Sequence, residues 1–327
     1  MADSDRKPHR FADPAGLPPE IGAPLARFNG DRPPAPHWFD KALANRPERS
    51  MIEVEGCPIE LLTWGEVGKP GLLFLHGNAA HADWWSFIAP FFADDYRVAA
   101  MSWSGMGASG WRPHYTGELF AAEALGAAEA AGLYVEGHKP IVIAHSFGGF
   151  ATRVMAAQHP DRLRAAVYVD SPIRPPESEW RGPPTRSRPN KVYATHAEAL
   201  ARFRLAPPQG CENLYIADFI ARHSLHEVEG GWTWKFDPAM WERFDRESMG
   251  DSHAAFGAAR VPVAALWGGR SNLIPSEVED YMRRMAPPGT PMIPIPDSDH
   301  HVMIDQPLAL VAALRALLET WPITPHP

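Results

Sequence analysis

Short apolar runs alternate with helical patterns over most of the chain. Residues 72–75, 141–143 and 165–169 are continuously apolar, which is typical of strands buried on both faces of a sheet. Apolar residues at helical spacing follow the second run, from Ala151 onward, until Pro160 ends the pattern. Before these runs, a strand pair is predicted at residues 51–54 and 59–64.

The same alternation is found elsewhere in the chain. Before residue 140, a strand is predicted at 97–101 and a helix at 118–135. After residue 260, strands are predicted at 263–267 and 292–295, with helices from 276 and at 307–319. Strands alternating with helices favour a single, mostly parallel sheet in an α/β fold. Two segments depart from the pattern: residues 1–47 are rich in proline, and residues 172–260 are rich in proline, arginine and tryptophan, with helical patches but no strand signal.

These shifts in pattern predict the domain organisation. We expect residues 1–47 to form an arm that lies on the surface or is partly disordered. Residues 48–171 and 261–327 would form the α/β core, interrupted by an insert at 172–260.

Composition narrows the class of protein. The chain has 327 residues, of which 45% are hydrophobic, so it can bury a sizeable core. Its net charge of −8 argues against a nucleic-acid partner. Cys57 and Cys211 lie far apart and imply no disulfide framework. Because the sequence shows no apolar leader and no apolar run of membrane length, we expect a cytoplasmic protein without a membrane partner, which could form a homo-oligomer.

The segment 140–150 holds the strongest candidate for chemistry. Small residues, Ala144 and Gly148, stand two positions before and after Ser146, between a predicted strand and a predicted helix. A serine on such a sharp strand-to-helix turn is a nucleophile elbow, although the usual first glycine of the motif is here alanine. The alternative is an ordinary strand–helix turn.

Four motifs in a fixed order extend this interpretation. They are His76-Gly77, Ser104-Gly-Met-Gly-Ala-Ser109, Ala144-His-Ser-Phe-Gly-Gly149, and Asp299-His300-His301 followed by Asp305-Gln306-Pro307. In order and separation they resemble the α/β-hydrolase superfamily, over about residues 53–321. The resemblance implies an eight-stranded, mostly parallel sheet with helices on both faces and a helical cap (lid) inserted after the sixth strand, at 172–260. It also implies no cofactor and the hydrolysis of an ester or related bond.

The resemblance assigns the nucleophile and the base. Ser146 would be the nucleophile, because a serine hydroxyl attacks only when a base takes its proton. The catalytic histidine of the superfamily lies five residues before an acidic residue that precedes a proline by two, which selects His300 by counting back from Asp305. His301 would pack or line the pocket. The histidines form no convincing metal-ligand set in the sequence, so no metal is expected.

The acid departs from the usual pattern. The position that commonly holds it, three residues after Gly268, is occupied by Ser271, which cannot carry a negative charge. Some relatives take the acid from the end of the sixth strand, where this chain has Asp170, and we expect Asp170 to be the acid. Two alternatives remain: Asp170 only caps a turn, or Asp299 serves, which is less favourable because adjacent side chains seldom hydrogen-bond in the needed geometry.

The oxyanion hole needs only main-chain donors. One is the N–H of Phe147, the residue after the nucleophile. In relatives the second comes from the residue after His-Gly, which is Asn78 here. One such donor contributes about 3 kcal/mol to catalysis.

These residues predict a serine hydrolase that cleaves an ester, lactone or similar acyl bond through an acyl-enzyme. We expect a small-molecule acyl substrate with an apolar part. Two alternatives stay open. One is a carbon–carbon bond hydrolase of the meta-cleavage-product type, which shares the serine elbow. The other is a non-catalytic binding protein with this fold, favoured only by Ser271 in the acid position. No motif in residues 172–260 names the substrate or its acyl chain length.

Overall fold

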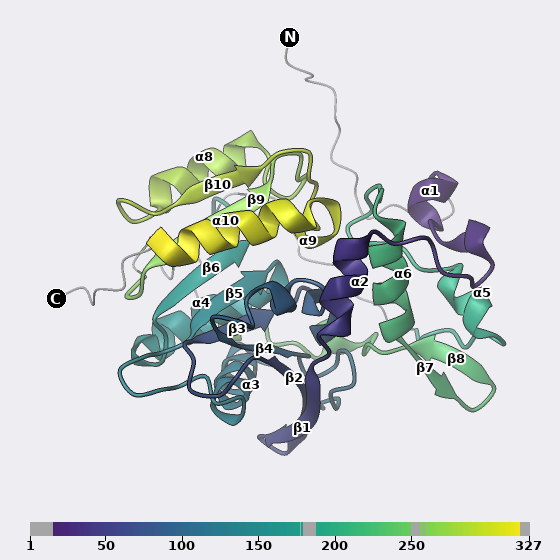
Figure 1. Cartoon of the computed structure of the whole chain (residues 1–327), viewed down its shortest axis with the longest axis horizontal. Coiled ribbons are helices and arrows are strands. Elements are labelled where there is room, and N and C mark those ends of the chain that lie inside the picture. The colour runs from purple at the N-terminus through teal and green to yellow at the C-terminus, as the bar shows by residue number, and fades with distance from the viewer. Residues whose placement is uncertain (1–15, 177, 179–187, 250–255, 258, 321–327) are drawn as a thin grey trace, which may run out of the picture.

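An eight-stranded sheet forms the centre of the molecule in the computed structural model, which describes residues 16–320 except 177, 179–187, 250–255 and 258 (Figure 1). Its strand order is β1-β2-β4-β3-β5-β6-β9-β10. The strands are β1 Glu48–Val54, β2 Cys57–Trp64, β3 Gly71–Leu75, β4 Arg97–Met101, β5 Ile141–His145, β6 Ala165–Val169, β9 Val263–Gly268 and β10 Met292–Ile295. β2 runs antiparallel to β1 and to β4, and all other neighbours are parallel. The predicted fold class is therefore confirmed.

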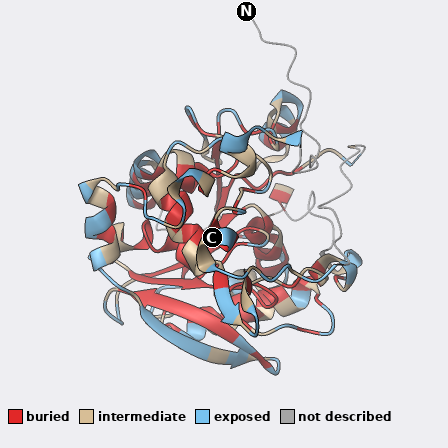
Figure 2. Ribbon diagram, turned by 90° about the vertical axis from the view of Figure 1, so that its right-hand side faces the viewer, coloured by how far each residue is buried: buried red, intermediate tan, exposed pale blue. Residues whose placement is uncertain are grey.

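The central strands are buried on both faces, as their continuous apolar runs predict (Figure 2). Val142 on β5 pairs with Leu73 on one side and Ala166 on the other. These three side chains belong to the apolar cluster on one face of the sheet, whereas the next residue, Ile143, belongs to the cluster on the opposite face. The alternation follows from the two-residue period of a strand.

Helices cover both faces. α3 (Gly117–Ala130), α4 (Phe147–Gln158) and α8 (Ser276–Met285) bury their apolar residues in the same cluster as Val142. α10 (Pro307–Thr320) contributes Leu310 and Leu314 to the other cluster, and the short α9 (Val302–Asp305) precedes it. The helices that the sequence predicts around the core are therefore present, on both sides of the sheet.

The chain leaves the sheet after β6 and returns to it at β9. The intervening insert contains α5 (His196–Leu200), α6 (Leu214–His223) and a hairpin of β7 (Leu225–Val228) and β8 (Gly231–Trp234). The sequence predicts helices here but no hairpin. Each hairpin strand has only four residues and is mostly exposed or half-buried, so neither carries an apolar run that would identify it.

The N-terminal segment is more closely packed than a surface arm. Its described part contains α1 (Pro19–Gly22), a 3-10 turn at Ala26–Phe28 and α2 (His37–Ala44). Phe39 on α2 is buried, and its ring lies 5.7 Å from Phe87 of the core and 4.9 Å from Tyr215 of α6. The arm thus fills a position between the core and the insert, where α2 and α6 lie side by side (Figure 1). Among the described helices, none combines the length and apolar character needed to span a bilayer.

Candidate active site

Ser146 occupies the sharp turn between β5 and α4. Its backbone has φ 51° and ψ −116°, a left-handed conformation that residues with a side chain rarely adopt and that is typical of a nucleophile elbow. The Ser146 N–H donates to the carbonyl of Val169 at 3.0 Å, and the Ser146 carbonyl accepts from Ser171 Oγ at 2.9 Å. Both main-chain groups are therefore engaged, and the side chain borders a pocket.

The glycines after Ser146 are required by close packing. A Cβ on Gly148 would lie 2.8 Å from the His76 carbonyl oxygen and 2.9 Å from that of Leu75. A Cβ on Gly149 would collide with Ser171 Oγ. α4 can therefore begin against the end of β3 only because these positions have no side chain. Ala144, in contrast, is fully buried without a clash, which explains why this position need not be glycine.

His300 and Asp170 are in direct contact. His300 lies in the loop between β10 and α9, and its Nδ1 is 2.6 Å from Asp170 Oδ1. Asp170 directly follows β6, which lies between β5 and β9, so its carboxylate is one strand away from the elbow. A carboxylate on Nδ1 keeps the proton there and leaves the lone pair of His300 on Nε2. His300 also lines the pocket beside Ser146.

The residue in the usual acid position supports Asp170 instead of replacing it. Ser271 Oγ donates to Asp170 Oδ1 at 2.8 Å, and the Gly268 N–H donates to Asp170 Oδ2 at 2.9 Å. Asp170 is fully buried, and its side chain contacts the last residue of β9, the loop after β9 and His300. This arrangement differs from a turn cap before Pro172.

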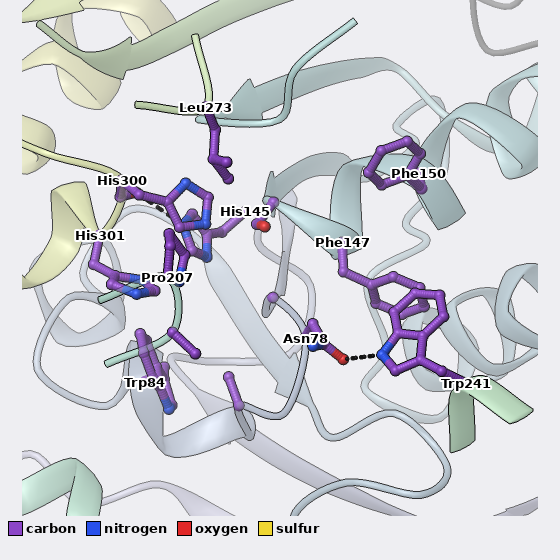
Figure 3. A pocket seen from close by; sticks show the side chains of 14 residues that line it. Asn78, Trp84, His145, Phe147, Phe150, Pro207, Trp241, Leu273, His300 and His301 are labelled. Atoms are coloured by element: carbon purple, nitrogen blue, oxygen red, sulfur yellow. Dashed lines mark hydrogen bonds between the residues drawn. The ribbon is translucent and has the colours of Figure 1, made fainter. Parts of the chain in front are cut away.

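Asn78 and Phe147 lie together at the other side of the pocket (Figure 3). Within the part of the chain that the structure describes, neither main-chain N–H has an acceptor, so both are free to hold an oxyanion. Trp241 of the insert contacts both residues: its Nε1–H donates to Asn78 Oδ1 at 3.0 Å, and its ring lies 5.6 Å from that of Phe147. Sequence reasoning does not single out Trp241 for this contact, because no motif surrounds it.

The pocket is mostly apolar. The empty space in it, including the solvent at its open mouth, is about 590 Å³. Its aromatic and aliphatic walls are formed by Ala80, Trp84, Phe147, Phe150, Ala206, Pro207, Trp241 and Leu273. Three of these, Ala206, Pro207 and Trp241, belong to the insert. The insert therefore shapes the pocket together with the core.

Three histidines meet beside Ser146. His145, His300 and His301 are buried, and one ring nitrogen of each lies within 4.8 Å of the others. Burial, reinforced by His300, holds the pKa of His145 well below its usual value, and the pKa of His301 is lowered well below its usual value by the same causes. The sequence shows no such set, because 155 positions separate His145 from His300 and only the fold brings them together.

Comparisons with known proteins agree with this architecture. The model of the alpha/beta hydrolase family matches residues 72–314, so the chain belongs to that family. The resemblance seen in the sequence and the expectation of a hydrolase are thereby confirmed.

Two individual relatives illustrate the similarity, at sequence identities of 20% to 24%. The chain is 24% identical over 294 residues to the esterase Rv0045c of Mycobacterium tuberculosis, covering 86% of this chain and 93% of the relative. The crystal structure of that esterase superposes with a TM-score of 0.61 at 21% identity, covering 93% of this chain and 99% of the other. A thioesterase domain from the curacin biosynthetic pathway gives a TM-score of 0.69 at 20% identity, covering 84% of this chain and all of the domain.

Proposed function

We propose that this protein is a serine carboxylic ester hydrolase with Ser146 as nucleophile, His300 as base and Asp170 as acid. The observation that carries the proposal is the 2.6 Å contact between His300 Nδ1 and Asp170, in a pocket that also contains the strained Ser146. The similarity to an esterase and to a thioesterase domain supports cleavage of an acyl bond.

In the proposed reaction, Ser146 Oγ attacks the carbonyl carbon of the ester while its proton passes to His300 Nε2. The carbonyl oxygen becomes an oxyanion, which the main-chain N–H groups of Phe147 and Asn78 stabilise. The protonated His300 then gives its proton to the leaving alcohol, and an acyl-Ser146 remains. Water, deprotonated by His300, releases the carboxylic acid and restores the serine. Asp170 orients the imidazole and balances its charge throughout.

The pocket walls indicate the substrate class. Aromatic and aliphatic side chains, among them Trp84, Phe150 and Leu273, favour an acyl or alcohol group with an apolar part over a highly charged one. We propose that the insert at 172–260 acts as a cap, since Pro207 and Trp241 from it close part of the pocket. Lactones and thioesters would react by the same steps. No structural observation favours carbon–carbon bond cleavage over ester hydrolysis.

Labelling by a fluorophosphonate probe, run beside a panel of p-nitrophenyl esters of increasing acyl length, tests the proposal. We expect rapid labelling of the wild-type protein, no labelling of Ser146→Ala, and a fall in ester turnover of about 10⁶-fold in that variant. Ser276→Ala, which changes an exposed serine on α8, is the matched control and should behave as the wild type.

Two results would contradict the proposed ester hydrolysis. If folded wild-type protein is not labelled and cleaves no ester, a binding function is favoured. If it turns over a vinylogous dienone but none of the esters, the reaction class is wrong.

A further inference from the structure

The catalytic histidine is one member of a compact imidazole cluster. The ring centroids of His145 and His300 are 4.7 Å apart, those of His300 and His301 are 4.8 Å apart, and those of His145 and His301 are 5.6 Å apart. All three line the pocket, so a small solute that enters it can reach them. The proposed ester hydrolysis uses only one of the three rings.

Hydrogen bonding leaves a lone pair available on each ring. His145 Nε2 lies 3.1 Å from the His300 carbonyl oxygen, which only accepts, so this nitrogen carries the proton and Nδ1 is left without a partner. His300 donates from Nδ1 to Asp170, which leaves Nε2. The Ala206 backbone lies close enough to His301 to accept a hydrogen bond from one ring nitrogen, although among the described residues neither nitrogen meets strict hydrogen-bond geometry, so the other ring nitrogen keeps a lone pair. Buried nitrogens without a protein partner need a water molecule or a ligand to satisfy them.

We propose that His145, His300 and His301 bind a divalent transition-metal ion and that the bound ion inhibits the enzyme. Three imidazoles form a donor set that suits Zn²⁺, Cu²⁺, Ni²⁺ or Co²⁺, whereas Mg²⁺ and Ca²⁺ prefer oxygen. Inhibition follows because the lone pair of His300 Nε2 cannot both hold a metal and accept the proton of Ser146. The inhibitory part rests on the proposed function, but metal binding does not.

Two features of the site favour binding. Asp170 accepts the Nδ1 proton of His300, the outer contact that metal-bound histidines commonly make. Tetrahedral coordination at the usual Zn–N distance places nitrogens about 3.4 Å apart, so ring nitrogens that lie within 4.8 Å of one another need to approach by up to about 1.4 Å.

Direct binding is tested first, without substrate. We expect the purified wild-type protein to bind one Cu²⁺, with an electron paramagnetic resonance spectrum whose hyperfine pattern shows three imidazole nitrogens. In the ester assay, Zn²⁺ and Ni²⁺ should abolish turnover, EDTA should restore it, and Mg²⁺ and Ca²⁺ should have no effect. Fewer than three nitrogens, or inhibition by Mg²⁺ equal to that by Ni²⁺, would overturn the proposal.

Variants locate the site. His301→Gln and His145→Gln should each raise the Ni²⁺ concentration for half-inhibition by at least about tenfold, with every variant compared with its own metal-free rate. His226→Gln, on the exposed hairpin strand β7, is the control and should leave that concentration unchanged. Unchanged inhibition in the first two variants would overturn the proposal. If a variant does not fold, the number of imidazole nitrogens in the wild-type Cu²⁺ spectrum decides whether the three histidines bind the ion. Three-nitrogen binding by a protein that cleaves no ester would support the metal site and contradict only the proposed function.

Discussion

The two sides of the pocket around Ser146 are held in different ways. On one side, the hydrogen-bond partners of His300 and Asp170 come from residues of the core: Gly268 and Ser271 bind the carboxylate, and the carboxylate binds the imidazole. On the other side, Asn78 offers a main-chain donor, and its side chain is bound by Trp241 from the insert. Figure 3 shows the histidines and the Asn78–Trp241 pair on opposite sides of the pocket.

The proposed acid and base are therefore held by the core, whereas the insert helps to shape the substrate site. The proposed acid–base side is held by the ends of β6, β9 and β10, which are neighbours in the sheet. On the proposed oxyanion side, the Asn78 side chain is bound by a residue of the insert. Changes on the acid–base side should therefore abolish turnover, whereas changes in the insert should adjust it.

Among the changes that test this comparison, the largest expected effect comes from the acid. Asp170→Asn keeps the shape of the side chain but removes its charge, and an amide can stabilise the wrong tautomer of His300. We expect kcat to fall by about four orders of magnitude for a p-nitrophenyl ester, with an unchanged circular dichroism spectrum. A folded variant with near wild-type kcat would show that Asp170 is not the acid.

A smaller effect is expected when the carboxylate is moved from position 170, after β6, to position 271, after β9. Ser271 Oγ lies 2.8 Å from the same carboxylate oxygen that contacts His300, so an aspartate at 271 can reach the imidazole. The double variant Asp170→Ser/Ser271→Asp should turn over the ester at least about tenfold faster than Asp170→Ser alone, because the charge beside the imidazolium returns. Equal rates in the two folded variants would show that position 271 cannot serve His300.

Much of the acid–base side could be anticipated from the sequence because it depends on strand order. The apolar runs at 141–143 and 165–169 identify buried strands, and residues at the carboxyl ends of adjacent parallel strands meet at one edge. Asp170 directly follows the second run, and Ser146 comes three residues after the first. The structure accordingly places Asp170 beside His300, and Ser146 in the same pocket.

The remaining features depend on contacts that no local pattern encodes. Trp241 is one of several tryptophans in an insert without clear periodicity, and only its packing reveals the bond to Asn78. His145 meets His301 because β5 and the loop after β10 end at the same edge of the sheet. Phe39 is buried although its segment is rich in proline, because the core and α6 provide an apolar site for it.

The smallest expected effect concerns Trp241 and tests whether the insert supports the oxyanion side. Trp241→Phe keeps an aromatic ring against Phe147 but removes the donor to Asn78 Oδ1. One hydrogen bond contributes about 1 kcal/mol, so we expect kcat to fall by about fivefold with little change in KM, since the loop loses its orientation and not its apolar contacts.

Trp84→Phe provides the matched control, because Trp84 lines the same pocket on the histidine side and its buried Nε1–H has no acceptor among the described residues. That variant loses a similar volume but no hydrogen bond, so any change should fall on KM. A cycle that adds Asn78→Ala separates the contact from the volume: after Asn78→Ala, the change at Trp241 should have no further effect on kcat, since the acceptor is gone. Equal effects of Trp241→Phe with and without Asn78, or a rise in KM alone, would show that Trp241 only shapes the pocket. In that case the core alone would hold the catalytic groups of both sides, and the insert would only line the pocket.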